Sequence, residues 1–283
     1  MTTIYLVYYT KKAIIAFEFL QRVIMKHILV TNDDGFESKG LHELVEALRP
    51  LGRVIVVAPT VEKSACGHSL TLTRPLRFVE LGNDFFKLDD GTPTDCVFLA
   101  LNKLFNEGCK PDLIISGINK GSNMGEDITY SGTAAAAMEA VLQGIPAMAV
   151  SQVCHGQCQN IDDFGYELAK NTVTTLAKRI LENGFPLGSR KFLNVNIPPI
   201  SSELCNGLMI TRAGKRLYGN DAAVHNNPRG IEHYWIGLPR LDWEQTEGEM
   251  SDFDAIDQGF VSITPVHLDM TSHMDIETLK QWL

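Results

Sequence analysis

The sequence predicts an α/β fold with a doubly wound, mainly parallel sheet and a β-rich C-terminal arm. Short apolar runs at residues 28–30, 53–59 and 112–116 have the composition of strands that are buried on both faces. Segments with the apolar spacing of helices lie between these runs, up to about residue 200. Beyond that point, short strands alternate with polar, turn-rich stretches, which indicates a separate β-rich part.

The boundaries of the predicted elements have local causes. The first strand ends at Asn-Asp-Asp-Gly, where Gly35 permits a sharp turn, and a helix then begins near Lys39. Pro59 ends the second strand, and Thr92 is placed to cap a helix that starts at Pro93. We predict further strands at residues 69–73, 85–88, 147–151 and 192–197, and further helices at residues 134–141 and 163–181.

Three segments are expected along the chain. The apolar run within residues 1–24 is too short to span a bilayer. Because these residues precede the first buried strand, we expect them to be an extension outside the core. Residues 25–200 are expected to form the α/β core, and residues 201–283 the β-rich part. The sheet of the core already looks complete at residue 200, before the β-rich part begins. The stretch 243–258 is acidic and poor in hydrophobic residues, so we expect it to contact another subunit.

Large aromatic residues in the C-terminal part predict self-association. Tyr234, Trp235 and Phe260 have no obvious place to be buried within their own subunit, and exposed aromatics of this size form interaction patches. Exchange of an arm between identical chains would bury them with closed symmetry. We therefore expect a homodimer or a homotetramer.

Composition excludes some partners. The chain has 283 residues, 45% hydrophobic content and a net charge of −9, as in a soluble globular protein without the basic face that nucleic-acid polymers or anionic membranes require. The six cysteines are scattered, which predicts reduced thiols and a cytoplasmic location. The motif Cys154-His155-x-x-Cys158 lacks a second ligand pair at zinc-finger spacing, so zinc is disfavoured there.

Two adjacent carboxylates, Asp33 and Asp34, directly follow the first buried strand. Like charges repel and burial makes each charge more costly, so a divalent cation would remove both penalties. Hard cations such as Mg²⁺, Mn²⁺ or Ca²⁺ prefer these oxygen ligands. An isolated Asp-Asp-Gly is typical of a surface turn, and the buried strand before it favours a metal site instead.

Two further polar loops are predicted at the same edge of the sheet, because ligands of doubly wound sheets bind beyond the carboxyl ends of the strands. One loop contains Ser64, and the other runs from Asn119 to Thr133, where a Ser-Gly-Thr sequence opens a helix. Taken separately, Ser64 could face solvent and Asn119 could cap a turn. Together with the Asp pair they predict an all-oxygen metal site that handles phosphate.

These motifs resemble the SurE (survival protein E) family. The resemblance is carried by Thr-Asn-Asp-Asp-Gly at 31–35, Val-Val-Ala-Pro at 56–59 with Ser64 after it, and the long motif at 116–133. Gly-Phe-Val-Ser-Ile-Thr-Pro at 259–265 is also similar. The likeness runs from Met25 to the C-terminus and implies a Rossmann-like core with a C-terminal arm exchanged between subunits.

The resemblance also implies a divalent-metal-dependent phosphatase of nucleoside monophosphates. It implies that Asp33, Asp34, Ser64 and Asn119 hold one cation per subunit, Mg²⁺ or Mn²⁺. On this hypothesis Asp33 and Asp34 are the catalytic residues. Both hold the metal, and one of them also positions or deprotonates the attacking water. The residues that would bind phosphate are Asn123, Ser131, Gly132 and Thr133.

The leading interpretation is a 5′-nucleotidase, and 3′-nucleotides or short polyphosphate are further substrates that the sequence leaves open. A non-catalytic nucleotide- or metal-binding regulator is the alternative, which the paired Asp residues argue against. A dehydrogenase is disfavoured because no Gly-x-Gly-x-x-Gly follows the first strand. The leaving oxygen needs an acid, for which His68 and His233 are candidates, although a single histidine is more often structural.

Overall fold

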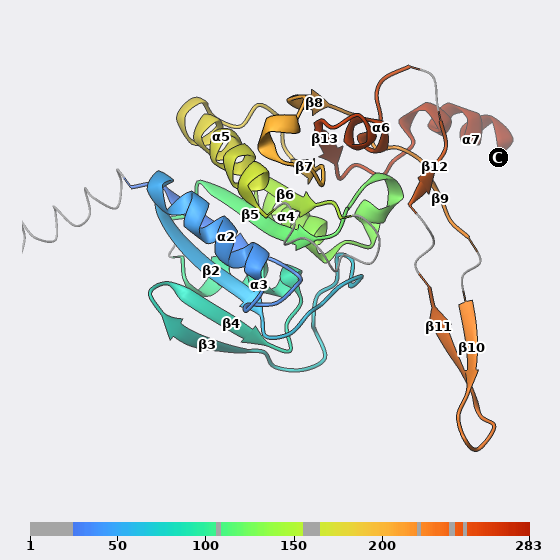
Figure 1. Cartoon of the computed structure of the whole chain (residues 1–283), viewed down its shortest axis with the longest axis horizontal. Helices are drawn as coiled ribbons and strands as arrows, with labels where there is room; N and C mark the ends of the chain where they lie inside the picture. Colours follow the sequence, from blue (N-terminus) through green and yellow to red (C-terminus); the bar gives the residue numbers. More distant parts are fainter. Residues whose placement is uncertain (1–24, 106–108, 155–164, 220–221, 238–240, 246–247) are drawn as a thin grey trace, which may run out of the picture.

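A nine-stranded sheet forms the centre of the molecule, with the order β3-β4-β2-β1-β5-β6-β7-β13-β8 (Figure 1). The computed structural model describes residues 25–105, 109–154, 165–219, 222–237, 241–245 and 248–283. The strands of the sheet are β1 (His27–Thr31), β2 (Arg53–Pro59), β3 (Arg77–Gly82), β4 (Phe85–Asp89), β5 (Leu113–Lys120), β6 (Ala147–Gln152), β7 (Lys191–Ile197), β8 (Leu208–Ile210) and β13 (Val261–His267). Most neighbouring strands are parallel, so the predicted α/β class with a mainly parallel sheet is confirmed.

Helices cover both faces of this sheet. The four long helices are α2 (Lys39–Leu48), α3 (Pro93–Lys103), α4 (Gly132–Leu142) and α5 (Glu167–Asn183). Because successive strand residues point to opposite faces, β1 contributes to two cores. Ile28 and Val30 pack with α2 and α5 on one face, and Leu29 packs with α3 and α4 on the other.

The strand order reverses beside β1. This strand lies between β2 and β5 and is parallel to both, so the chain leaves it toward one side and later returns on the other. The loops that follow β1 and β5 therefore leave the carboxyl edge at a topological switch point, where ligands of such sheets bind. At Gly40 a Cβ atom would come within 2.1 Å of the Ile118 carbonyl oxygen, so the start of α2 packs directly on the backbone of β5.

The edge of the sheet differs from the prediction at residues 69–73, which form a loop. The backbone N–H and the hydroxyl of Thr71 donate to Asp95 at 2.9 and 2.6 Å, so these groups are not free to pair with a neighbouring strand. The edge strand is instead β3, which is antiparallel to β4 and was not predicted. Thr92 caps α3 as expected, with Asp95 completing a capping box.

The sheet is not complete at residue 200, contrary to expectation. Strand β13 pairs with β7 and β8, so the C-terminal part supplies two strands of the central sheet. Helix α6 (Asp252–Asp257) also packs within its own chain, where Phe253 is buried and stacks on Trp243 with ring centroids 5.3 Å apart. Phe253 therefore anchors α6 within its own chain, and the expected contact of residues 243–258 with another subunit stays a prediction.

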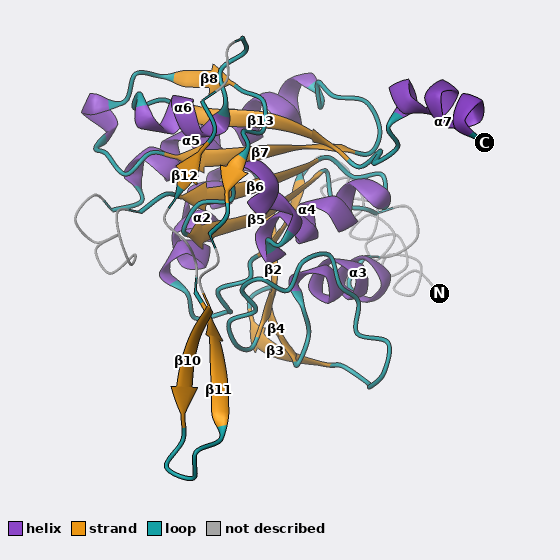
Figure 2. Cartoon of the chain, turned by 90° about the vertical axis from the view of Figure 1, so that its right-hand side faces the viewer, coloured by secondary structure: helices purple, strands orange, loops and turns teal. Residues whose placement is uncertain are grey.

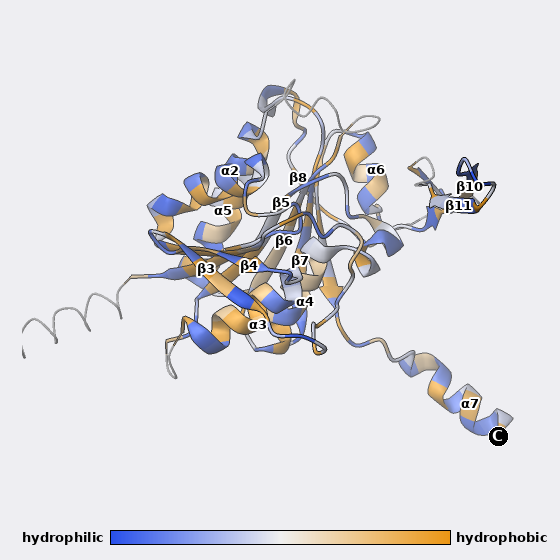
Figure 3. Cartoon of the chain, turned by 90° about the horizontal axis from the view of Figure 1, so that it is seen from below, coloured by the Kyte–Doolittle hydropathy of each residue, from blue (hydrophilic) through white to orange (hydrophobic). Residues whose placement is uncertain are grey.

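Two elements project from the body. Strands β10 (Ala222–Asn226) and β11 (Glu232–Ile236) form an antiparallel hairpin that extends away from the sheet (Figures 1 and 2). Helix α7 (Ile276–Trp282) lies at the C-terminal periphery (Figure 3). A small second sheet joins β9 (Arg216–Leu217) to β12 (Asp242–Trp243). Tyr234 and Trp235 are exposed on the hairpin, whereas Phe260 is half-buried against its own chain.

Several predictions concern residues beyond those described. Residues 1–24, His155 and Cys158 lie outside the described part, and the segment boundaries at residues 24 and 200 stay predictions. Cys154 is disulfide-bonded, so the prediction that all six cysteines are reduced is wrong there, because sequence spacing cannot show whether two sulfur atoms meet. The free thiols are Cys66, Cys96, Cys109 and Cys205. Within the described residues, every helix is too short or too polar to cross a membrane.

Candidate active site

The paired carboxylates lie at the carboxyl end of β1, at the switch point of the sheet. The Asp33 side chain is buried, with 3% of the residue exposed, and Asp34 is partly buried. Gly35 follows with φ +96°, in the left-handed region that glycine adopts without strain, and this turns the chain toward α2.

Each of the other two predicted loops is hydrogen-bonded to this pair. The backbone N–H of Lys63, the neighbour of Ser64, donates to the Asp33 carbonyl oxygen at 2.7 Å. The backbone N–H of Lys120, the neighbour of Asn119, donates to Asp34 Oδ2 at 3.0 Å. The three loops that the sequence analysis singled out therefore meet at one point of the structure.

The N-terminus of α4 holds the Asp33 carboxylate. The Thr133 N–H donates to Asp33 Oδ2 at 3.0 Å, and the Thr133 hydroxyl donates to Asp33 Oδ1. Ser131 caps the helix by accepting the Ala134 N–H at 3.0 Å. At Gly132 a Cβ atom would lie only 2.8 Å from the Asp33 Cβ atom, so the helix can approach this closely only with glycine. The positive end of the helix dipole then favours the ionised carboxylate.

The pair carries more negative charge than its surroundings balance. Burial raises the pKa of Asp33, although the hydrogen bonds from Thr133 lower it. Burial, and next the neighbouring charge of Asp33, raise the pKa of Asp34 to about 7. Glu62 adds to the negative potential at both groups. A bound cation would reverse these shifts, because it favours the ionised form of each carboxylate.

The two neutral candidate ligands differ in exposure. Ser64 is exposed, and its hydroxyl donates to Glu62 Oε1 at 2.7 Å. Asn119 is buried, and its Nδ2 donates to the Gly121 carbonyl oxygen at 2.9 Å. That bond orients the Asn119 amide and leaves its oxygen available as a ligand.

These groups fit a hard divalent cation. The side-chain oxygen of Asn32, beside Asp33, is buried without a hydrogen-bond partner, as occurs where a bound ion or water completes a site. Among the described residues, no three His, Cys, Asp or Glu side chains gather around one point. The site therefore offers two carboxylates and neutral oxygens, a set that suits Mg²⁺ or Mn²⁺ better than Zn²⁺.

Asn123, predicted to bind phosphate, lies in a buried polar network. Its N–H donates to Asn196 Oδ1 at 2.9 Å, and its side-chain amide donates to Ser151 at 2.8 Å. Its carbonyl oxygen accepts from the amides of Asn194 and Asn196 at 2.8 and 3.0 Å. The network fastens the loop after β5 to β6 and β7, and phosphate binding by Asn123 stays a prediction.

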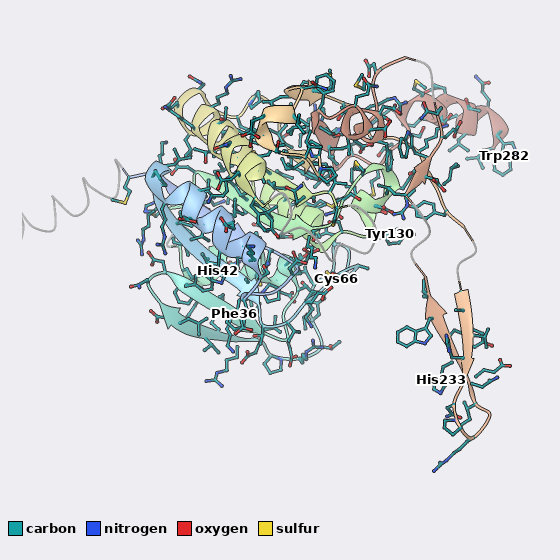
Figure 4. All side chains as sticks on the ribbon, in the orientation of Figure 1. Phe36, His42, Cys66, Tyr130, His233 and Trp282 are labelled. Carbon is teal, nitrogen blue, oxygen red and sulfur yellow. The ribbon has the colours of Figure 1, made fainter. Side chains whose placement is uncertain are left out.

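The predicted acid candidates lie in different places. His68 belongs to the Ser64 loop, and its Nε2 is 3.1 Å from Glu139 Oε2 on α4. His233 lies on the projecting hairpin, away from Cys66 beside the Asp pair (Figure 4). Burial raises the pKa of the Cys66 thiol to about 11, which disfavours a thiolate nucleophile at this site.

Comparison with known proteins identifies the family. The family model described as "Survival protein SurE" matches residues 28–220. The chain belongs to the SurE family. A protein named 5′-nucleotidase SurE from Sulfurovum sp. (strain NBC37-1) is 65% identical over 258 residues, which cover 91% of this chain and 98% of that protein. A protein of the same name from Aliarcobacter butzleri (strain RM4018) is 60% identical over 260 residues, or 92% of this chain and 99% of the relative.

The fold agrees with a solved SurE structure. The crystal structure of the SurE protein from Aquifex aeolicus has a TM-score of 0.77 and 41% sequence identity, and the match covers 90% of this chain and 99% of that one. The resemblance on which the sequence analysis rested is therefore confirmed.

Two features of this SurE site were not predicted from the sequence. Thr133 was expected to bind phosphate, yet its N–H and hydroxyl both donate to Asp33. Glu62 was not considered for the site, although its charge acts on both Asp33 and Asp34. The available signal was the position of Glu62, two residues before Ser64 in the same loop.

We expect the stabilities of wild type and Asp34→Asn in EDTA to diverge as pH rises. The folded-state pKa of Asp34, about 7, lies above its ordinary value of 3.8, so the folded protein holds this proton more tightly than the unfolded chain. The wild-type contribution from this proton is fully present below the unfolded pKa of 3.8 and is lost progressively as pH rises from there to about 7, whereas the asparagine of the variant cannot ionise. Asp34→Asn should therefore melt with wild type at about pH 4 and above it at about pH 8, with part of the difference already present at about pH 5.

Differential scanning fluorimetry at about pH 4 and about pH 8 measures this divergence. Saturating Mn²⁺ should reverse the order at the higher pH, because it stabilises only the protein that binds it tightly. Equal Tm values for the two proteins at both pH values would contradict the view that Asp34 is buried and lacks a neighbouring positive charge that balances it.

Proposed function

We propose that this SurE protein is a divalent-metal-dependent phosphomonoesterase that hydrolyses nucleoside 5′-monophosphates to nucleoside and phosphate. The proposal rests on the Asp33–Asp34 pair at the switch point, where each carboxylate is fixed by a donor from a different loop. The activity is supported by relatives named 5′-nucleotidase SurE, which are 65% and 60% identical over nearly their whole length.

The residues that would hold one Mg²⁺ or Mn²⁺ ion are Asp33, Asp34, Ser64 and Asn119. Such an ion, when bound, neutralises phosphoryl oxygens and makes a water a better nucleophile. The side chains of the protein orient the reacting groups and accept the proton of the attacking water. Thr133 keeps the Asp33 carboxylate oriented, and Asp34, whose Oδ2 is held by the Lys120 N–H, is the group that accepts a proton from the attacking water.

Phosphate binding uses the entrance to α4 and the loop before it. The first N–H groups of a helix lack intrahelical partners, so the Gly132 N–H is the donor best suited to a phosphoryl oxygen. Ser131 and Asn123 extend this anion site in our proposal, while Thr133 acts chiefly through Asp33. For the proton that the leaving oxygen needs, His68 is the better candidate because it shares the loop of Ser64.

Phosphate release from AMP, GMP, 3′-AMP and tripolyphosphate, with and without EDTA, tests the proposed function. We expect release from the 5′-nucleotides, lost in EDTA and restored by excess Mn²⁺. Release from the 3′-nucleotide or tripolyphosphate would widen the substrate range. Binding of AMP without any phosphate release under metal-saturated conditions would contradict the proposal and favour the non-catalytic regulator.

Ser64→Ala is expected to weaken activity less than loss of either carboxylate. A hydroxyl is a weaker ligand than a carboxylate, and a water can replace it, so we expect about a tenfold fall in kcat/KM at limiting Mn²⁺. The loss should shrink as Mn²⁺ is raised. Ser189→Ala, at an exposed serine in the turn before β7, is the matched control. A loss that excess Mn²⁺ does not reduce would argue against Ser64 as a metal ligand.

We further propose that the protein assembles as a homodimer or homotetramer. One face of the β10–β11 hairpin presents Val224, Tyr234 and Ile236 to solvent, and Trp282 is exposed on α7. An unpartnered apolar surface of this kind is typical of an interface. Light scattering across a dilution series measures the assembly. A monomer that stays fully active at low micromolar concentration would contradict it.

A further inference from the structure

The β10–β11 hairpin carries a pair of histidines that the proposed reaction does not use. In the antiparallel register, His225 lies directly opposite His233. Directly opposed residues have Cβ atoms about 4.5–5.5 Å apart on the same face of the ribbon, within reach of one shared ligand. Both side chains are exposed, and neither has a hydrogen-bond or ion-pair partner among the described residues.

The turn at the end of the hairpin fixes this register. The Asn227 N–H donates to the Ile231 carbonyl oxygen, and the Gly230 N–H donates to the Asn227 carbonyl oxygen, both at 2.9 Å. Gly230 has φ +77°, which glycine adopts without strain. The Asn227 side chain also accepts the N–H groups of Arg229 and Ile231 at 2.9 and 3.0 Å. The two histidines are therefore held opposite each other by local contacts.

The two faces of the hairpin have different chemistry. Val224, Tyr234 and Ile236 lie on one face, since alternate residues point the same way and opposed residues share a face. His225, His233 and Trp235 lie on the other face. Both histidines line a surface hollow, which also includes Tyr234 and Asn226 of the first face. An interface on the apolar face would leave the histidine face accessible.

We propose that His225 and His233 form a bidentate imidazole site for a borderline divalent cation such as Zn²⁺ or Cu²⁺. Imidazole suits these ions, whereas Mg²⁺ and Mn²⁺ prefer the oxygen ligands of the Asp33–Asp34 site. No third His, Cys, Asp or Glu joins the pair among the described residues, so water fills the remaining coordination positions.

Zinc titration of the full-length protein by isothermal calorimetry, in saturating Mg²⁺ at about pH 7.5, tests this site. We expect His225→Gln and His233→Gln each to raise the Kd of one zinc ion per chain by about tenfold or more. His267→Gln is the matched control, because His267 is an exposed strand histidine that faces Lys191 rather than a second histidine. Circular dichroism melting confirms that each variant is folded.

Copper quenching of tryptophan fluorescence gives a second readout. Trp235 is two residues from His233 on the same face, so Cu²⁺ bound to the pair should quench its emission. We expect most of the copper-dependent quenching of wild type to be absent in Trp235→Phe and also in His225→Gln. Zinc binding and copper quenching that are the same in wild type and both histidine variants would overturn the proposal, as would an equal loss in His267→Gln.

Discussion

Asp34→Asn is expected to abolish phosphate release from AMP while the protein stays folded. Asparagine keeps the shape and can still accept the Lys120 N–H, which donates to Asp34 Oδ2 at 3.0 Å. It removes the negative charge that binds the cation and accepts the proton. Metal-assisted activation of the phosphoryl group is worth several kcal/mol, so we expect kcat/KM to fall by about a thousandfold or more.

The assay compares phosphate release at saturating Mn²⁺ in Asp34→Asn and Asp33→Ala. Asp33→Ala should be equally inactive, and it should also lower Tm, because it leaves the buried donors of Thr133 without an acceptor. Asp257→Asn removes an exposed carboxylate of α6 and is the control, for which we expect wild-type turnover. Wild-type turnover in both site variants would remove the metal site from this account.

Gly132→Ala is expected to impair both activity and stability, although it adds only a methyl group. The new Cβ atom would lie 2.8 Å from Asp33 Cβ, 2.9 Å from Asp33 Oδ2 and 3.0 Å from the Cys66 sulfur. Either α4 or the carboxylate must move, which breaks the bonds from Thr133 and displaces the catalytic group. Overpacking of this kind costs about 1–3 kcal/mol, and a displacement of about 1 Å lowers turnover by about a hundredfold.

Gly188→Ala separates this effect from the general cost of replacing glycine. A Cβ atom at Gly188 would meet nothing within 4 Å, so we expect stability within about 0.5 kcal/mol of wild type and unchanged turnover. Urea unfolding and steady-state phosphate release are measured on both variants. A Gly132→Ala protein with wild-type stability and turnover would show that contact with α4 does not fix Asp33.

Most of the fold could be predicted because the buried strands are local apolar runs. The run before Asp33 pointed to β1, and the cap at Thr92 gave the start of α3, since both depend on neighbouring residues alone. The piece at residues 69–73 was misassigned because Thr71 bonds Asp95, 24 residues away, and no local pattern reveals that partner. Strand β13 was likewise assigned to the arm, because its pairing with β7 joins residues far apart in the chain.

For the site, the residue types and their order could be read directly from the chain: paired carboxylates after a strand, a serine in the next loop, and an asparagine-rich loop leading into a helix. These are local features, so the chemistry of oxygen ligands and phosphate could be predicted from them. How these parts meet depends on the three-dimensional fold. It directs both donors of Thr133 to Asp33 and turns α6 inward through Phe253, because each contact depends on distances between elements that the sequence does not specify.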